Sequence, residues 1–231
     1  LFRSGARILG AGPSGSGVDR RHQRHGAGVG QQRPELGHAV GGRGADDASL
    51  DHRPGVALVS SGGSRGQHRA PDFLKLNPNG HVPVMDDDGF ILFESLAINL
   101  YLVKKYGAGG PLGPASLQEE ALITQWSLWV VNEVETLLIT ILLNRLMLPE
   151  AERNTAAADS AERRLQKPLA VLEGALTGPD YLVGNRFTVA DLNVSIVMSL
   201  INRLALDITR YPNVRAWLDT CLGRPAAKGF A

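Results

Sequence analysis

The stretch HVPVMDDDGFILFES, residues 81–95, decides the fold of the region around it. Two short apolar runs, 82–85 and 90–93, flank the turn residues Asp-Asp-Asp-Gly, a pattern typical of a β-hairpin with glycine where positive φ is most needed. We expect the three aspartates, 86–88, to form a solvated turn. The apolar segment after Ser95 predicts a helix, so the local order is strand, strand, helix.

The same stretch offers two kinds of ligand-binding group. The residue before a proline is extended, and a cis Val82–Pro83 bond would turn the backbone of Val82 outward to pair with a short peptide. Ser95 lies at a helix N-terminus, where free N–H groups favour a carboxylate. Glu94 beside it supplies a counter-charge for an ammonium. Together these residues could bind a peptide and the two charges of an amino acid.

Downstream of a Gly/Pro-rich linker at 108–114, the pattern is helical throughout. Capping boxes, prolines and sustained apolar periodicity predict an all-α domain over residues 115–231. The capping box Ser116/Glu119 predicts a long first helix, with no proline before Pro149, and a second helix should run from about Thr155 to Leu176 and contain Pro168. The capping box Thr188/Asp191 predicts a third helix that ends at Leu204, and Pro212 opens a last one.

Composition excludes several functional classes. The chain has 231 residues, 43% of them hydrophobic, and a formal charge of +1, which gives no reason to expect a nucleic-acid or membrane partner. The single cysteine, Cys221, excludes an internal disulfide and a cysteine metal cluster, and it is typical of a reducing compartment. We find no uninterrupted apolar run of membrane-spanning length and no signal-peptide pattern in residues 1–20.

Two segments carry a family resemblance. HRAPDFLKLNPNGHVPVMDDDGFILFESLAINLYL (68–102) resembles the later half of the thioredoxin-like domain of the soluble, bacterial-type glutathione S-transferases, and YLVGNRFTVADL (181–192) resembles a segment of their helical C-terminal domain. The resemblance covers 67–231. It implies an incomplete thioredoxin-like α/β domain over 67–107, followed by the all-α helical bundle.

The resemblance also implies a function. It predicts a cytoplasmic homodimer that conjugates the thiol of glutathione to hydrophobic electrophiles, with glutathione as co-substrate and with no metal or other cofactor. Asn132, Glu133 and Glu135 are candidates for the electrophile pocket, although a subunit contact or a solvated face is the simpler interpretation of them. Seven residues would bind glutathione: Val82 and Pro83 the cysteinyl part, Glu94 and Ser95 the γ-glutamyl end, and His81, His68 and Arg69 the glycyl carboxylate and nearby peptide groups.

Residues 1–66 do not match the family pattern. They contain 16 of the 27 glycines, nine arginines and no lysine, and their large aliphatic residues are too sparse to support folding alone. We therefore expect this segment to be poorly ordered, and we hypothesise that it is frameshifted or foreign. Without a family-like first strand, the hairpin would expose a strand edge.

Two motifs in residues 1–66 bear on catalysis. Family members place a thiol-activating hydroxyl after their first strand, and LFRSGARILG (1–10) offers only Ser4 for that role. GAGPSG (10–15) matches a dinucleotide-binding turn, but it lacks both the strand and the helix that such a turn needs. The catalytic residue therefore stays open. So do two alternative functions: a catalytically impaired remnant or interaction module of the same fold, and a glutathione-dependent isomerase or peroxidase.

Overall fold

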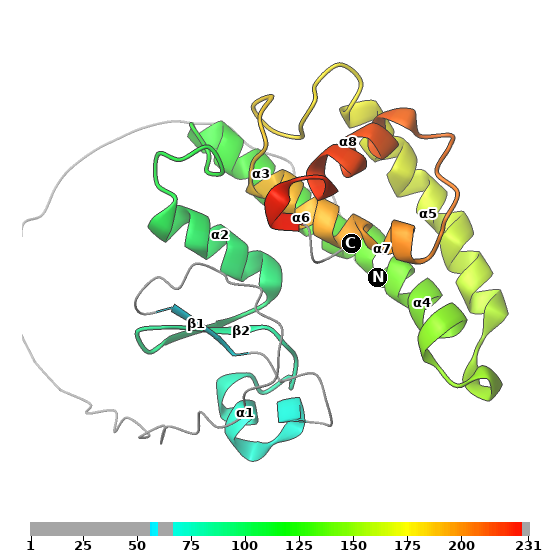
Figure 1. The fold of residues 1–231 in the computed structure, drawn as a ribbon, viewed down its shortest axis with the longest axis horizontal. Helices are drawn as coiled ribbons and strands as arrows, with labels where there is room; N and C mark the ends of the chain where they lie inside the picture. The colour runs from blue at the N-terminus through cyan, green and yellow to red at the C-terminus, as the bar shows by residue number, and fades with distance from the viewer. Residues whose placement is uncertain (1–55, 60–66, 228–231) are drawn as a thin grey trace, which may run out of the picture. The chain divides into compact units, whose positions relative to one another are not determined.

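The computed structural model describes residues 56–59 and 67–227 (Figure 1). Its first part is a small sheet with helices. The elements are β1 (Val56–Val59), the short 3-10 helix η1 (Gln67–Arg69), α1 (Pro71–Leu76), β2 (Val84–Asp87), β3 (Phe90–Phe93) and α2 (Ser95–Tyr106).

The second part is entirely helical. Its elements are α3 (Leu117–Trp129), the π-helical η2 (Val130–Glu135), α4 (Thr136–Leu142), the π-helical η3 (Leu143–Met147), the 3-10 helix η4 (Glu150–Glu152), α5 (Thr155–Ala175), α6 (Val189–Met198), α7 (Leu200–Arg203), α8 (Pro212–Leu222) and the 3-10 helix η5 (Pro225–Ala227).

The predicted hairpin is confirmed. β2 and β3 pair antiparallel, with Val84 opposite Phe93 and Asp87 opposite Phe90. The two turn residues, Asp88 and Gly89, both have positive φ, at 52° and 88°, as a tight two-residue hairpin turn requires. Glycine adopts this conformation freely, and aspartate tolerates it better than most residues.

One strand lies where we expected none. β1, with the sequence VALV, falls inside the 1–66 segment and pairs antiparallel with β2, Val59 opposite Val84 and Val56 opposite Asp87. β2 is therefore the central strand of the three, and the β2 edge that a lone hairpin would leave open is paired. Four apolar residues among glycines and serines give little local signal, because a strand is stabilised by a distant partner.

The solvated-turn prediction is wrong for Asp87. Its side chain is fully buried and accepts three hydrogen bonds, from Lys105 Nζ at 2.6 Å, Tyr101 Oη at 2.6 Å and Tyr106 Oη at 2.7 Å. The Lys105 ammonium and the two hydroxyls lower the pKa of Asp87 to about 2. Asp87 is the last residue of β2, and it ties that strand to the second half of α2. Of the three aspartates only Asp88 is exposed, and Asp86 is half-buried.

A buried polar chain links α2 to the helical part. Asn99 Nδ2 donates to Asn193 Oδ1 at 2.8 Å, Asn193 Nδ2 donates to Ser127 Oγ at 2.9 Å, and Ser127 Oγ donates to the Ile123 carbonyl at 2.8 Å. Asn193 is completely buried. Because buried amides are costly unless paired, this chain fixes α2 against α6 and α3.

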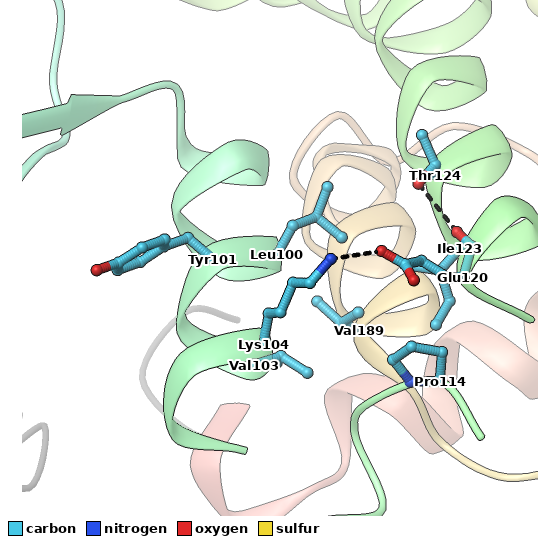
Figure 2. A pocket seen from close by; sticks show the side chains of 9 residues that line it. All are labelled: Leu100, Tyr101, Val103, Lys104, Pro114, Glu120, Ile123, Thr124 and Val189. Atoms are coloured by element: carbon cyan, nitrogen blue, oxygen red, sulfur yellow. Dashed lines mark hydrogen bonds and ion pairs between the residues drawn. The ribbon is translucent and has the colours of Figure 1, made fainter. Parts of the chain in front are cut away.

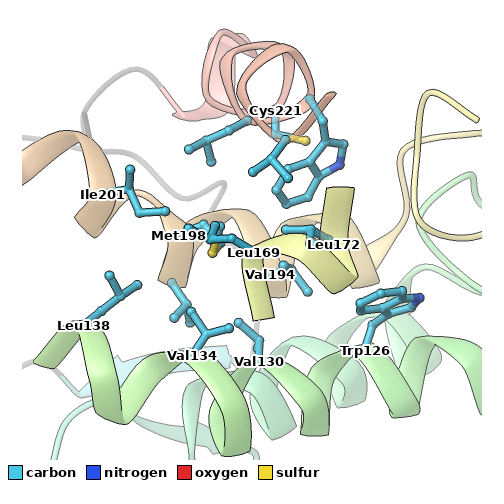
Figure 3. Packing of buried hydrophobic residues seen from close by; sticks show 14 of the residues in the cluster. Trp126, Val130, Val134, Leu138, Leu169, Leu172, Val194, Met198, Ile201 and Cys221 are labelled. Atoms are coloured by element: carbon cyan, nitrogen blue, oxygen red, sulfur yellow. The ribbon is translucent and has the colours of Figure 1, made fainter. Parts of the chain in front are cut away.

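The long helix predicted after Ser116 extends from Leu117 to Met147, with two π-helical segments inside it. By length and composition alone this stretch could cross a membrane, although charged residues such as Glu133 and Glu135 interrupt its apolar sequence. The core helix of a soluble protein passes the same test. Here 44% of the most apolar window is buried, and Val130, Val134 and Leu138 pack into the core in Figure 3.

That core is shared by α3 to α8. Leu169 and Leu172 of α5 meet Val194 and Met198 of α6, with Cys221 of α8 above them (Figure 3). Burial raises the pKa of Cys221 to about 12, so its thiol is inert and packs as a small hydrophobe, as predicted.

The second predicted capping box is confirmed. The Thr188 side chain accepts from the helix amides, and Asp191 Oδ2 accepts from Thr188 N at 2.9 Å. Asp191 Oδ1 also accepts from Leu182 N at 2.9 Å and from Trp217 Nε1 at 3.0 Å, so this buried carboxylate joins α6 to α8. The helix that we predicted to reach Leu204 is divided into α6 and α7.

The first predicted capping box is only half formed. Ser116 Oγ accepts from Glu119 N at 3.2 Å, but the Glu119 carboxylate accepts from Ala115 N and pairs with Arg186 at 2.6 Å. Arg186 also donates to the Gly113 carbonyl. Glu119 and Arg186 therefore fasten the 108–114 linker to the helical part.

Candidate functional site

Four of the seven predicted binding residues lie at one end of the hairpin. Val84 pairs with Phe93, so Val82 and Pro83, which precede Val84, are neighbours of Glu94 and Ser95, which follow Phe93. This end is opposite the Asp88–Gly89 turn. The hairpin register thus brings the two halves of the predicted site together.

The Val82–Pro83 bond is cis, as the sequence suggested, and Val82 is 48% exposed. His81 is exposed, and its carbonyl accepts from Asn77 Nδ2 at 2.8 Å. This hydrogen bond to the buried Asn77 holds the segment that leads into β2.

The helix boundary differs from our expectation by one residue. α2 begins at Ser95, and Glu94 occupies the N-cap position without a side-chain capping hydrogen bond. Both side chains are exposed. Glu94 has φ 73° and ψ 110°, a conformation that non-glycine residues rarely adopt and that recurs at functional sites. The free amides of the first turn of α2 remain available to an anion.

His68 and Arg69 come from η1. The His68 carbonyl lies 3.1 Å from the position that a Cβ on Gly80 would occupy, so η1 packs closely against the turn that precedes His81. His68 is half-buried, whereas Arg69 is exposed. The structure thus places His68 beside the chain segment that leads to the site, and it leaves Arg69 in solvent.

The helical part contributes one acidic residue near the site. Glu135, at the end of η2, is half-buried; burial and then the charge of Glu94 raise its pKa. Asn132 and Glu133, our other candidates for the electrophile pocket, are exposed. Glu135 is thus electrostatically coupled to Glu94, a predicted glutathione-binding residue.

Sequence reasoning missed the groups that hold the site in place. Asp87 and the pair Asn99–Asn193 anchor β2 and α2, the two elements that carry it. One sequence feature could have revealed them: a polar residue in an apolar helix often has a buried hydrogen-bond partner. Asn193 is such a residue, because it interrupts a helix that is otherwise apolar nearly all round. The candidate hydroxyl, Ser4, lies outside the described residues, as does the GAGPSG motif.

Comparison with known proteins agrees with the fold. Residues 61–104 match the model of the N-terminal domain of glutathione S-transferases, and residues 135–225 match that of the C-terminal domain. The first match begins six residues before Gln67, where we had placed the start of the resemblance.

Individual relatives extend this match. Glutathione S-transferase 4 of Zea mays is 31% identical over 190 residues, which cover 80% of this chain and 83% of the maize protein. A theta class glutathione S-transferase of Xanthomonas axonopodis pv. citri, solved with glutathione bound, is 30% identical with a TM-score of 0.67, over 72% of this chain and 80% of that one. URE2P5 of Phanerochaete chrysosporium, cocrystallised with 1-(S-glutathionyl)-2,4-dinitrobenzene, is 27% identical with a TM-score of 0.65, over 69% of this chain and 77% of that one. The chain therefore belongs to the glutathione S-transferase family.

Proposed function

We propose that this protein binds glutathione at the open end of the β2–β3 hairpin and conjugates it, through its thiol sulfur, to hydrophobic electrophiles. The observation that carries the proposal is the juxtaposition of Val82–Pro83 with Glu94–Ser95. It is supported by the relatives whose structures contain glutathione or a glutathione conjugate.

Each group has a distinct role in binding. The backbone of Val82 pairs with the cysteinyl peptide unit in the manner of an added strand. The amides at the start of α2 and the Ser95 hydroxyl hold the γ-glutamyl carboxylate, and Glu94 holds the neighbouring ammonium. Glu135 adds a second negative charge near that ammonium. His81, His68 and Arg69 form the side that we assign to the glycyl carboxylate.

The conjugation reaction requires the thiolate of glutathione, because the thiolate attacks the electrophile far faster than the thiol does. A hydroxyl that donates to the sulfur would stabilise it. Ser4 is the candidate that the sequence offers for this role.

Two experiments together test the proposal. Calorimetric titration measures glutathione binding by the full chain, and 1-chloro-2,4-dinitrobenzene tests turnover, since its product absorbs and is the conjugate held by the fungal relative. If the chain binds glutathione and turns over the substrate, and Ser4→Ala abolishes the turnover, the result supports a transferase. Binding without turnover supports a non-catalytic module, and absence of both contradicts the proposal.

We also infer a homodimer located in the cytoplasm. The chain has a single cysteine, which suits a reducing compartment. The Leu117–Met147 stretch exposes apolar side chains that a second copy could cover, and sedimentation of the wild type against Leu128→Lys tests this. The exposed large apolar residues of this stretch are Leu117, Leu122, Leu128, Val131, Ile139, Leu143, Leu146 and Met147.

A further inference from the structure

Asn193 is a buried amide whose hydrogen bonds leave it only one orientation. Its side chain is completely buried in the middle of α6. Ser127 Oγ donates its hydrogen to the Ile123 carbonyl at 2.8 Å, so towards Asn193 it can only accept. Asn193 therefore presents its amide NH₂ group to Ser127, at 2.9 Å, and its carbonyl oxygen to Asn99 Nδ2, at 2.8 Å. This polarity makes Asn99 of α2 the donor at the outer end of the chain of hydrogen bonds.

Asn99 lies one helical turn behind the residues of α2 that we assign to glutathione. It follows Ser95 by four residues, and side chains at this spacing project from the same face of a helix. The Ile98 amide, which closes the first turn, donates to the Glu94 carbonyl at 2.9 Å. A hydrogen bond at Asn99 therefore restrains the turn whose free amides would hold the γ-glutamyl carboxylate.

Farther along α2, contact with the helical part is looser. Leu100 and Lys104 point from α2 toward the helical part in Figure 2, whereas Tyr101 points the opposite way. A cavity of about 260 Å³ remains at this junction, between side chains such as Leu100 and Ile123. The Lys104 side chain, which pairs with Glu120 at 2.8 Å, is 78% exposed, so this ion pair restrains α2 only weakly. The bond from Asn99 to the buried amide of α6 supplies a direction that apolar contact lacks.

The proposed glutathione site draws on both of the parts that this bond joins. Glu94 and Ser95 come from the junction of β3 and α2, whereas Glu135 comes from η2 and is electrostatically coupled to Glu94. α6, which carries Asn193, packs against η2. A displacement of the first turn of α2 would therefore move Glu94 and Ser95 relative to Glu135.

We propose that Asn193 is a positioning residue for glutathione binding and that it acts through Asn99. It fixes the first turn of α2 against the helical part, so that Glu94, Ser95 and Glu135 reach the same γ-glutamyl group. This role rests on the proposed function, and it adds a fully buried residue to those that set the affinity for glutathione.

Calorimetric titration of glutathione into the full chain tests this role in Asn99→Ala, Asn193→Ala and the double variant. Loss of the Asn99–Asn193 bond should weaken binding about three- to tenfold. The double variant should bind no more weakly than Asn193→Ala, because the two residues act as one unit. Asn99 is only half-buried, so Asn99→Ala decides the test even if Asn193→Ala does not fold.

Ser127→Ala is the matched control. It removes the other hydrogen bond of the same amide, within the helical part, so it should lower stability in urea unfolding and change glutathione affinity by less than about twofold. Two results overturn the proposal: Asn99→Ala binding as tightly as the wild type, or Ser127→Ala binding as weakly as Asn99→Ala, because affinity would then follow stability.

Hydrogen exchange of the α2 amides, measured without ligand, separates this role from the glutathione site itself. Asn99→Ala should speed the exchange of the hydrogen-bonded amides of α2 about threefold or more, whereas Ser127→Ala should not. Unchanged exchange in Asn99→Ala overturns the proposal. A wild-type chain that binds no glutathione contradicts the proposed function, and the exchange result then decides alone whether Asn193 positions α2.

Discussion

Glu94→Gly is expected to make the protein more stable while weakening glutathione binding. Glu94 has φ 73° and ψ 110° at the junction of β3 and α2. A non-glycine residue held in such a conformation costs about 1–3 kcal/mol. Glycine adopts it without a clash of the Cβ, and glycine is also accepted at a helix N-cap.

The expected gain follows from two opposing contributions. Relief of the backbone strain at position 94 stabilises the folded state by about 1–3 kcal/mol. This gain is offset by about 0.5–1 kcal/mol, because glycine gives the unfolded chain more conformational freedom. The net stabilisation is therefore about 1 kcal/mol. For a chain of this size it corresponds to a rise in Tm of about 2–4 °C.

The assay is urea unfolding followed by far-UV circular dichroism, with Glu94→Ala as the matched control. Alanine removes the carboxylate but keeps the Cβ, so it retains the strain. Both variants should lose glutathione affinity to a similar extent, and only the glycine variant should gain stability. If Glu94→Gly is no more stable than Glu94→Ala, the junction is not strained and this reasoning is refuted.

Three further predictions concern two buried carboxylates and a glycine that hold the fold together. Asp191→Ala leaves buried donors such as Trp217 Nε1 without an acceptor; we expect a loss of at least about 3 kcal/mol in urea unfolding, and a loss below about 1 kcal/mol would contradict this role. The pKa of Asp87 is lowered to about 2, so its contribution to stability is complete above the ordinary aspartate range and is lost as pH falls from about 4 toward 2. Asp87→Asn should reduce the fall in unfolding free energy between about pH 4 and pH 2; an unchanged slope would mean that another carboxylate governs it. Gly80 has φ 64° and lies against the His68 carbonyl, so Gly80→Ala should destabilise by about 1–2 kcal/mol, and an equally stable variant would show that the turn rearranges.

The features that could be predicted from the sequence depend on neighbours along the chain. The Asp88–Gly89 turn, the capping box of Thr188 and the cis bond before Pro83 each have a local chemical cause. The helix N-terminus near Ser95 has one too, although its boundary moved by one residue. These local signals were enough to place Val82 and Ser95 at one end of a hairpin.

The features that were missed depend on partners far away in sequence. Asp87 looked like one of three solvated aspartates until α2 brought Lys105 and two tyrosines to it. Asn193 needs Asn99, which is 94 residues away, to satisfy its buried amide. β1 is a strand because β2 lies beside it. Tertiary pairing of this kind leaves no periodicity in the sequence.

Calorimetric titration of glutathione into the full chain, with Glu94→Ala and Ser95→Ala as controls, tests the central claim most directly. We predict saturable binding by the wild type, and each substitution should weaken it about tenfold or more through loss of a charge-assisted hydrogen bond. A folded chain that binds no glutathione, or binds it equally well in both variants, would contradict the assignment of this hairpin end as the glutathione site.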